Sequence, residues 1–259
     1  MKRVVFFGNN WLGYKVLEEL VKSDVEVVGV VLHPTEEADF EEKILQQVES
    51  IGSAVIRGRE LGKKNLKRSI QDLDPDIGVS AMYGYILPGS LIDVFPEGIV
   101  NLHPAYLPYN RGAFPNVWSI IDQTPAGVSL HYMDAGIDTG DIIAREEVDV
   151  EPVDTGKTLY EKLENHALEL FRDTWPSIIR GKVESESQDP EEGTYHEKDD
   201  VEEIDRIMLD QTYRARELIN RIRARTFPPY KGAYFIENGD KVFVRMQLYY
   251  ENELPPGGD

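Results

Sequence analysis

Apolar runs that alternate with helical stretches constrain the fold of this chain more than any other feature. Buried strands are predicted at residues 4–7, 25–32, 53–56, 77–80 and 99–102. Helices are expected between them at residues 12–21, where apolar side chains recur at helical spacing, at 41–50, and at 63–73, where the helix is basic. The alternation predicts an α/β fold with a Rossmann-like, doubly wound and mostly parallel sheet. Ligands of such sheets bind beyond the carboxyl ends of the strands.

The remaining pattern completes the first domain and predicts a second, smaller one. Strands are expected at 127–133 and 142–150, before a long amphipathic helix from Asp154 and Thr155 to residue 179. A polar, acidic stretch at 182–192 predicts a linker. Beyond it, a helix over 212–224 and a β-hairpin over 234–250 predict a small α+β domain. The predicted boundaries are 1–185 for the N-terminal domain, 193–251 for the C-terminal domain and 252–259 for a frayed tail.

The polar residues Asn101 and His103 stand where an apolar strand ends. Residues i and i+2 of a strand share a face, so these two side chains should lie together. A later carboxylate, Asp138, can join them. An amide, an imidazole and a carboxylate suit acyl transfer, because they can stabilise an oxyanion and move a proton. For an isolated histidine, a structural hydrogen bond would be the other interpretation.

Composition excludes several classes of protein. The net charge of −19 argues against binding to nucleic acid, whose partners usually carry a basic surface. The absence of cysteine excludes disulfides and thiolate chemistry and fits the cytoplasm. No apolar stretch has membrane-spanning length, so no membrane partner is expected. With five histidines, none in a His-x-x-x-His pair, we also expect no metal site.

Three ordered motifs carry a resemblance to a known family. They are Asn101-x-His103-Pro104, Leu107-Pro108-x-x-Arg111-Gly112 and Met133-Asp134-x-Gly136-x-Asp138-Thr139-Gly140-Asp141. Together they resemble those of the 10-formyltetrahydrofolate-dependent formyltransferases, over roughly residues 1–181. Residues 194–251 resemble the C-terminal part of sugar N-formyltransferases more than that of the tRNA enzymes. The resemblance implies the formyltransferase fold, with Asn101, His103 and Asp138 as the catalytic residues.

The resemblance also implies the co-substrate and where it binds. The expected donor is N10-formyltetrahydrofolate, and no metal is implied. The pterin pocket is expected to be lined, largely through backbone groups, by Tyr83, Gly84, Tyr85, Ile86 and Leu87, and closed by Gly136 and Ile137.

The resemblance implies contacts to the acceptor at the turn after the first strand, and further contacts are predicted in the loop after the Asn101–His103 strand and near the C-terminus. The candidates are Asn9, Asn10, Trp11, Arg111, Arg225 and Tyr230. This turn lacks the Gly-x-Gly-x-x-Gly and P-loop patterns, so a dinucleotide role is unsupported. Each of these contacts has a structural alternative. Trp11 serves equally well as a core anchor, and Arg225 can belong to a solvated edge or an interface. The aromatic residues after Arg225 can fill a small core.

The predicted acceptor is a nucleotide-linked amino sugar, formylated for a surface glycan. Methionyl-tRNA formyltransferase is the alternative, although residues 34–50 are acidic where such enzymes tend to carry a basic loop. A glycinamide ribonucleotide enzyme would usually end near the first domain. A non-catalytic folate- or nucleotide-sugar-binding protein is the alternative from another class. The C-terminal hairpin is a candidate surface for a homodimer.

Overall fold

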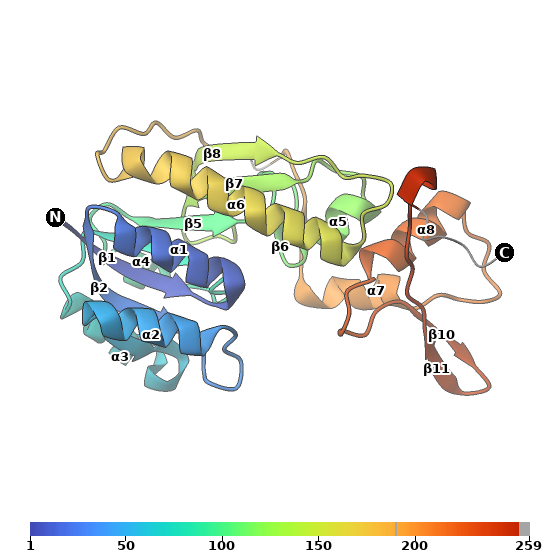
Figure 1. Ribbon diagram of the computed structural model, residues 1–259, viewed down its shortest axis with the longest axis horizontal. Coiled ribbons are helices and arrows are strands. Elements are labelled where there is room, and N and C mark those ends of the chain that lie inside the picture. Colours follow the sequence, from blue (N-terminus) through green and yellow to red (C-terminus); the bar gives the residue numbers. More distant parts are fainter. Residues whose placement is uncertain (190, 254–259) are drawn as a thin grey trace.

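A seven-stranded sheet forms the centre of the computed structural model, which describes residues 1–189 and 191–253. Its strand order is β3-β2-β1-β4-β5-β7-β8 (Figure 1). The bounds are β1 Lys2–Gly8, β2 Val25–Leu32, β3 Ala54–Arg57, β4 Ile77–Ala81, β5 Ile99–His103, β7 Gly127–Tyr132 and β8 Ile142–Glu147. Pairing is parallel from β3 to β5, whereas β7 runs antiparallel to both β5 and β8. The predicted Rossmann-like, mostly parallel fold is confirmed.

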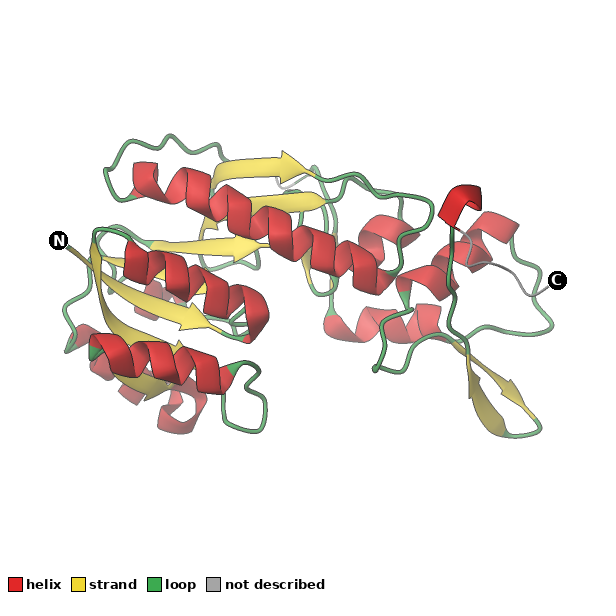
Figure 2. Cartoon of the chain, in the orientation of Figure 1, coloured by secondary structure: helices red, strands yellow, loops and turns green. Residues whose placement is uncertain are grey.

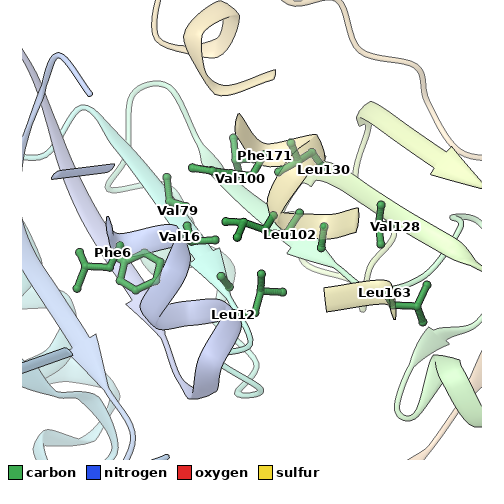
Figure 3. Close-up of a cluster of buried hydrophobic side chains, with 14 of the residues drawn as sticks. Phe6, Leu12, Val16, Val79, Val100, Leu102, Val128, Leu130, Leu163 and Phe171 are labelled. Atoms are coloured by element: carbon green, nitrogen blue, oxygen red, sulfur yellow. The ribbon is translucent and has the colours of Figure 1, made fainter. Parts of the chain in front are cut away.

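Helices cover both faces of this sheet (Figure 2). One face packs against α1 (Asn10–Lys22), α2 (Glu41–Ile51) and α6 (Gly156–Ile178). The other face packs against α3 (Gly58–Gln71) and α4 (Gly89–Ile92). Figure 3 shows side chains of α1 and α6 meeting the strands, among them Val16, Phe171, Val79, Val100 and Leu102. Both faces are therefore buried, which explains the continuous apolar runs of β1 and β2.

Short elements that the sequence pattern did not predict surround the end of β5. They are α5 (Pro115–Ile121), β6 (Arg111–Gly112) and β9 (Tyr195–His196). β6 pairs in parallel with β9, although the two strands lie more than 80 residues apart in the chain. Seven residues are too few to display a helical period, and two-residue strands display none. Tertiary contacts therefore decide these elements.

The C-terminal region has a small core of its own, built on Ile207, Ile222 and Ala233. It contains α7 (Val201–Asp205), α8 (Ala215–Ala224) and the antiparallel hairpin of β10 (Tyr234–Glu237) and β11 (Asp240–Phe243). The predicted α+β character and hairpin are confirmed, and the hairpin projects away from the sheet in Figure 1. The second strand ends at Phe243 rather than near residue 250, because the Met246 N–H bonds Thr226 Oγ1 instead of a strand.

Other predicted bounds shift by a few residues. The C-terminal helix begins at Ala215 rather than 212, β8 ends at Glu147 rather than 150, and a 3₁₀ turn, η2, occupies Glu251–Glu253. The predicted tail beyond residue 253 lies outside the described residues, and the domain boundaries remain predictions. Among the residues described, no helix has both the length and the apolar composition needed to cross a membrane.

Candidate active site

The three predicted catalytic residues meet at the carboxyl edge of the sheet. Asn101 and His103 end β5, and the loop between β7 and β8 brings Asp138 beside them. His103 Nε2 lies 3.6 Å from Asp138 Oδ2. Separate segments of the chain thus bring an imidazole and a carboxylate to the place where a doubly wound sheet binds its ligands.

Hydrogen bonds from two other segments hold the backbone and the carboxylate of Asp138 in place. Asp138 has a φ of 53°, in the left-handed region that few residues other than glycine adopt. The Gly112 N–H donates to Asp138 Oδ2 at 2.9 Å. The Gln188 side-chain amide donates to the carbonyls of Asp138 and Gly140, at 2.9 and 2.7 Å. Residues from β6 and from the predicted linker therefore hold a conformation that the loop alone would not favour.

Gln188 changes the interpretation of the predicted linker at 182–192. Its two hydrogen bonds and the β-bridge between Ile142 and Glu186 attach this segment to the active-site loop. Composition identified the stretch as polar but gave no sign of these contacts. Pro190 lies outside the described residues.

His131 is a site residue that sequence analysis missed. It stands on β7 directly opposite Asn101 in the β5–β7 register. Its Nδ1 lies 2.9 Å from the Tyr132 carbonyl, and its Nε2 lies 3.1 Å from Asn101 Nδ2 and 3.6 Å from Asp138 Oδ1. In the neutral ring, Nδ1–H donates to the carbonyl and Nε2 accepts from the Asn101 amide. His131 therefore fixes which side of Asn101 carries the donor group.

The signal for His131 was the antiparallel pairing of β7 with β5, which the alternation of strands and helices did not predict. Apolar and polar residues alternate along β7, from Val128 to Tyr132. Placing His131 beside Asn101 requires the register as well as this alternation.

Burial and charge set the protonation states in this site. Burial lowers the pKa of His103, and the nearby Asp138 carboxylate offsets only part of that effect. For Asp138, burial alone would raise the pKa, but His103, His131 and the Gly112 N–H together hold that pKa well below its ordinary value. At neutral pH the site therefore holds an ionised carboxylate beside a neutral His103 imidazole.

The predicted pterin loop follows β4 and borders a cavity of about 270 Å³. Tyr83, Tyr85, Ile86 and Leu87 line one wall, and residues of α3 line the other. Gly84 has a φ of 68° and turns the loop. Burial raises the pKa of Tyr83 to about 12, so its hydroxyl stays protonated. Asn101, His103 and Asp138 are not among the lining residues of this cavity.

Gly136 and Ile137 lie on the loop that carries Asp138 rather than on that cavity. The Gly136 N–H donates to Asp134 Oδ1 at 2.9 Å. A side chain at Gly136 would meet Thr139 Oγ1 at 2.0 Å, so the turn needs glycine there. Ile137 is exposed beside the site.

The turn after β1 places its three candidate acceptor residues differently. The side chain of Asn9 bonds the backbone of Asp39 and His33 Nδ1, at 2.8 and 3.2 Å. The Asn10 amide donates to Tyr160 Oη and Glu164 Oε1, at 2.8 and 3.2 Å. Trp11 is half-buried and packs against the main core.

The other three candidates lie on different segments. Arg111 is on β6, and its buried Nε has no hydrogen-bond partner among the residues described. Arg225 ends α8 and forms two bonds to the Asp205 carboxylate, at 2.5 and 3.0 Å. Tyr230 is 68% exposed and meets the ring of Phe227 edge-on. The role of these six candidates as acceptor contacts stays a prediction.

His33, which follows β2, links two parts of this edge and was also missed. Its Nδ1 contacts the Asn9 amide, and its Nε2 bonds the carbonyl of Tyr83. The ring also lies against Tyr85, with centroids 4.6 Å apart. Nothing in the sequence around His33 distinguishes it, because its partners come from two other strand ends.

Two family models match the chain, one over the N-terminal region and one over the C-terminal region. Residues 1–174 match the model described as formyl transferase. The chain belongs to the formyl transferase family. Residues 200–250 match the model described as N-formyltransferase dimerization C-terminal domain, so the chain is a formyltransferase with both parts.

Individual relatives agree on the family, and their names describe different formyltransferases. Methionyl-tRNA formyltransferase of Bacillus subtilis is 31% identical, covering 99% of this chain and 82% of the relative. The structure of a 4-N formyltransferase from Francisella tularensis is 30% identical, with a TM-score of 0.82, covering 96% of this formyltransferase and 98% of that chain.

A third relative is described with its ligands. It is a formyltransferase from Anoxybacillus kamchatkensis, in complex with UDP-4,6-dideoxy-4-formamido-L-AltNAc and tetrahydrofolate. That protein is 29% identical, with a TM-score of 0.55, and the match covers 78% of this chain and 88% of that one.

Proposed function

We propose that this formyltransferase moves the formyl group of N10-formyltetrahydrofolate to the amino group of a nucleotide-linked amino sugar. The observation that carries the proposal is the likeness to the Francisella 4-N formyltransferase over nearly the whole length of both chains. The Anoxybacillus complex, with a nucleotide-linked formamido sugar and tetrahydrofolate, supports both the acceptor class and the donor.

The convergence of Asn101, His103 and Asp138 supports a mechanism through a tetrahedral intermediate. The neutral amine attacks the formyl carbon, and the carbonyl electrons move to its oxygen. The free N–H of Asn101 stabilises that oxyanion, at roughly 3 kcal/mol. His103 adds to this stabilisation when it carries the proton that it shares with Asp138. Because His131 accepts one N–H of Asn101, the other N–H is left for this task.

Proton transfer completes the reaction. The amine nitrogen becomes positively charged when it bonds the formyl carbon, and it loses a proton to Asp138, directly or through water. Collapse of the intermediate breaks the bond from carbon to N10, and N10 takes up the proton that Asp138 accepted, directly or through water, to give tetrahydrofolate. The ionised Asp138 beside neutral His103 suits this transfer, because the pair can share the proton between them.

Methionyl-tRNA is the second candidate acceptor, and the 31% identity to the Bacillus subtilis enzyme favours it. The charge of this chain argues the other way. Residues 34–50, which lead into α2 and include all of it but Ile51, hold six acidic residues and Lys43 as the one basic residue. A net charge of −19 repels a polyanionic acceptor at distances shorter than the screening length of the salt.

A homodimer is part of the proposal. The C-terminal region matches a model described as a dimerization domain. Its hairpin exposes Ile236, Val242 and Phe243, and two-stranded hairpins are only marginally stable alone in water. A second copy that covered these side chains would stabilise the hairpin.

A competition between acceptors tests the proposal. Purified protein and N10-formyltetrahydrofolate are incubated with dTDP-, UDP- and GDP-linked amino sugars, with methionyl-tRNA and with glycinamide ribonucleotide. We expect a formamide product, identified by mass spectrometry, from at least one nucleotide sugar and none from the tRNA. Formylation of tRNA with an inert sugar panel would replace the proposed acceptor with the alternative.

A further inference from the structure

Helix α3 is basic in a chain that is otherwise strongly acidic. Its 14 residues hold five of the 28 lysine and arginine residues but one of the 47 acidic residues. The basic residues are Arg59, Lys63, Lys64, Lys67 and Arg68. Among the described side chains, Arg59 pairs with Glu37, and the ion pairs found include none of the other four. Like charges so close together repel one another, so an anion bound there would relieve the repulsion.

This helix forms one wall of the cavity that borders the loop at residues 83–87. Arg59 and Lys63 line the cavity from α3, opposite Tyr85, Ile86 and Leu87. The helix is interrupted between them at Gly62, which has a φ of 70°. Nothing lies within 4 Å of the position that a Cβ would take at Gly62, so the cavity is open at this point. A ligand can therefore reach the basic residues.

The same loop leads to the catalytic edge of the sheet. It follows β4, and Ser80 of β4 pairs with Asn101 of β5. A folate donor held along this loop, with its formyl group toward Asn101, would run from the catalytic edge toward the cavity that the loop borders. Ile86 is 71% exposed at the cavity wall, an apolar surface that suits the benzoyl ring of such a donor.

We propose that the basic face of α3, on the wall of the cavity that faces the predicted pterin loop, binds the oligo-γ-glutamate tail of the folate donor. This inference rests on the proposed function, because it requires folate to be the donor. Each γ-linked glutamate adds one carboxylate at regular intervals and changes nothing in the pterin. Lys63 and Lys67 lie one helical turn apart, about 6 Å along the axis, and so offer ammonium groups in series. Lysine is suited to such a flexible chain, because it acts as a mobile point charge.

Equilibrium binding of two folates tests this inference without any acceptor. The probes are 5-formyltetrahydrofolate with one glutamate and the same compound with five, titrated by calorimetry at low salt. We expect the pentaglutamate to bind about 10-fold tighter, and the advantage to fall as salt is added. In Lys63→Gln/Lys67→Gln the advantage should disappear, while the affinity for the monoglutamate stays within about twofold.

A matched variant controls for the loss of two positive charges. Arg180→Gln/Lys182→Gln removes exposed basic residues just beyond α6, which packs on the opposite face of the sheet. It should keep the preference for the pentaglutamate. Lys63→Gln alone, at an exposed position, gives a second variant in which folding is not at issue, and it should lose part of that preference.

The outcomes separate this inference from the proposed function. Equal binding of both folates by the unaltered protein, or a preference that survives in the double variant, would overturn the tail site and leave the donor assignment intact. Failure to bind either folate would overturn both. An α-linked pentaglutamate peptide that bound as tightly as the pentaglutamyl folate would also overturn the inference, since the patch would then recognise acidic peptides.

Discussion

The carboxyl edge of the central sheet and the C-terminal hairpin are built in opposite ways. At the edge, polar side chains are enclosed, and catalytic candidates have defined partners: Asn101 meets His131, and Asp138 is held by Gly112. On the hairpin, apolar side chains such as Val242 and Phe243 are 40% and 44% exposed. Chemistry requires atoms fixed relative to one another, whereas an exposed apolar surface is suited to association. The contrast predicts that catalytic and assembly defects can be separated.

The largest effect is expected at the catalytic residues themselves. Asp138→Asn removes a proton acceptor, and His103→Asn removes an imidazole, so each should lower kcat by at least ~10²-fold. Substrate binding should change far less, because these contacts strengthen mainly in the transition state. The double variant should lose much less than the product of the two single losses, since the residues act as one unit. Near-normal turnover by folded Asp138→Asn would show that the carboxylate supports its loop and does not accept the proton.

A smaller effect is expected at His131, which positions Asn101 rather than the substrate. His131→Asn can keep the contact to the Tyr132 carbonyl but is too short to reach Asn101, and kcat should fall about 10-fold. His131→Gln can place an acceptor near the original Nε2 position and should recover part of that loss. His166→Asn, on α6 beside Glu146, is the control and should leave kcat unchanged. Equal kcat in both His131 variants would mean that the Asn101 contact does not matter.

Between the two regions, α6 carries a buried carboxylate that should make stability depend on pH. Burial raises the pKa of Glu164 to about 7, although hydrogen bonds from Tyr160 and Asn10 act in the opposite direction. A raised carboxyl pKa means that the folded state disfavours the ionised form. The stabilisation is fully present below about pH 4.5, the ordinary value, and is lost as pH rises through about 7.

Glu164→Gln removes this dependence. Relative to the unaltered protein, its free energy of unfolding should rise by about 2–3 kcal/mol between pH 5 and pH 8, as measured by urea denaturation at each pH. Glu169→Gln, at an exposed position on the same helix, is the control and should show no such trend. A constant difference between Glu164→Gln and the unaltered protein at all pH values would contradict the raised pKa.

The smallest catalytic effect is expected at the hairpin. Val242→Ser/Phe243→Ser removes apolar surface from β11, and sedimentation should show a shift from dimer to monomer. Turnover of nucleotide sugar should stay within about twofold, because these side chains lie outside the sheet edge. Lys241→Gln, on the same strand, should leave the dimer intact. A loss of activity in proportion to the loss of dimer would contradict this prediction, because it would show that catalysis depends on assembly.

Sequence alone predicted the parallel part of the sheet, the α+β character of the C-terminal region and the three residues that meet at the sheet edge. The apolar runs of β1, β2, β4 and β5 are local signals, because a strand buried on both faces must be apolar throughout. The Asn101-x-His103 spacing is local as well, since a strand repeats every two residues. The hairpin turn at 238–240 was equally visible, because Asn and Gly at a turn are a short-range signal.

Tertiary structure decided what surrounds these residues. His131 joins Asn101 through the antiparallel register of β5 and β7, and Gln188 joins Asp138 from 50 residues away. The pairing of β6 with β9 and the link from His33 to Tyr83 likewise depend on segments that are distant in the chain. No local pattern encodes such contacts, because each partner's own sequence is compatible with many neighbours. The packed core selects one arrangement, and with it the geometry and the pKa values of the site.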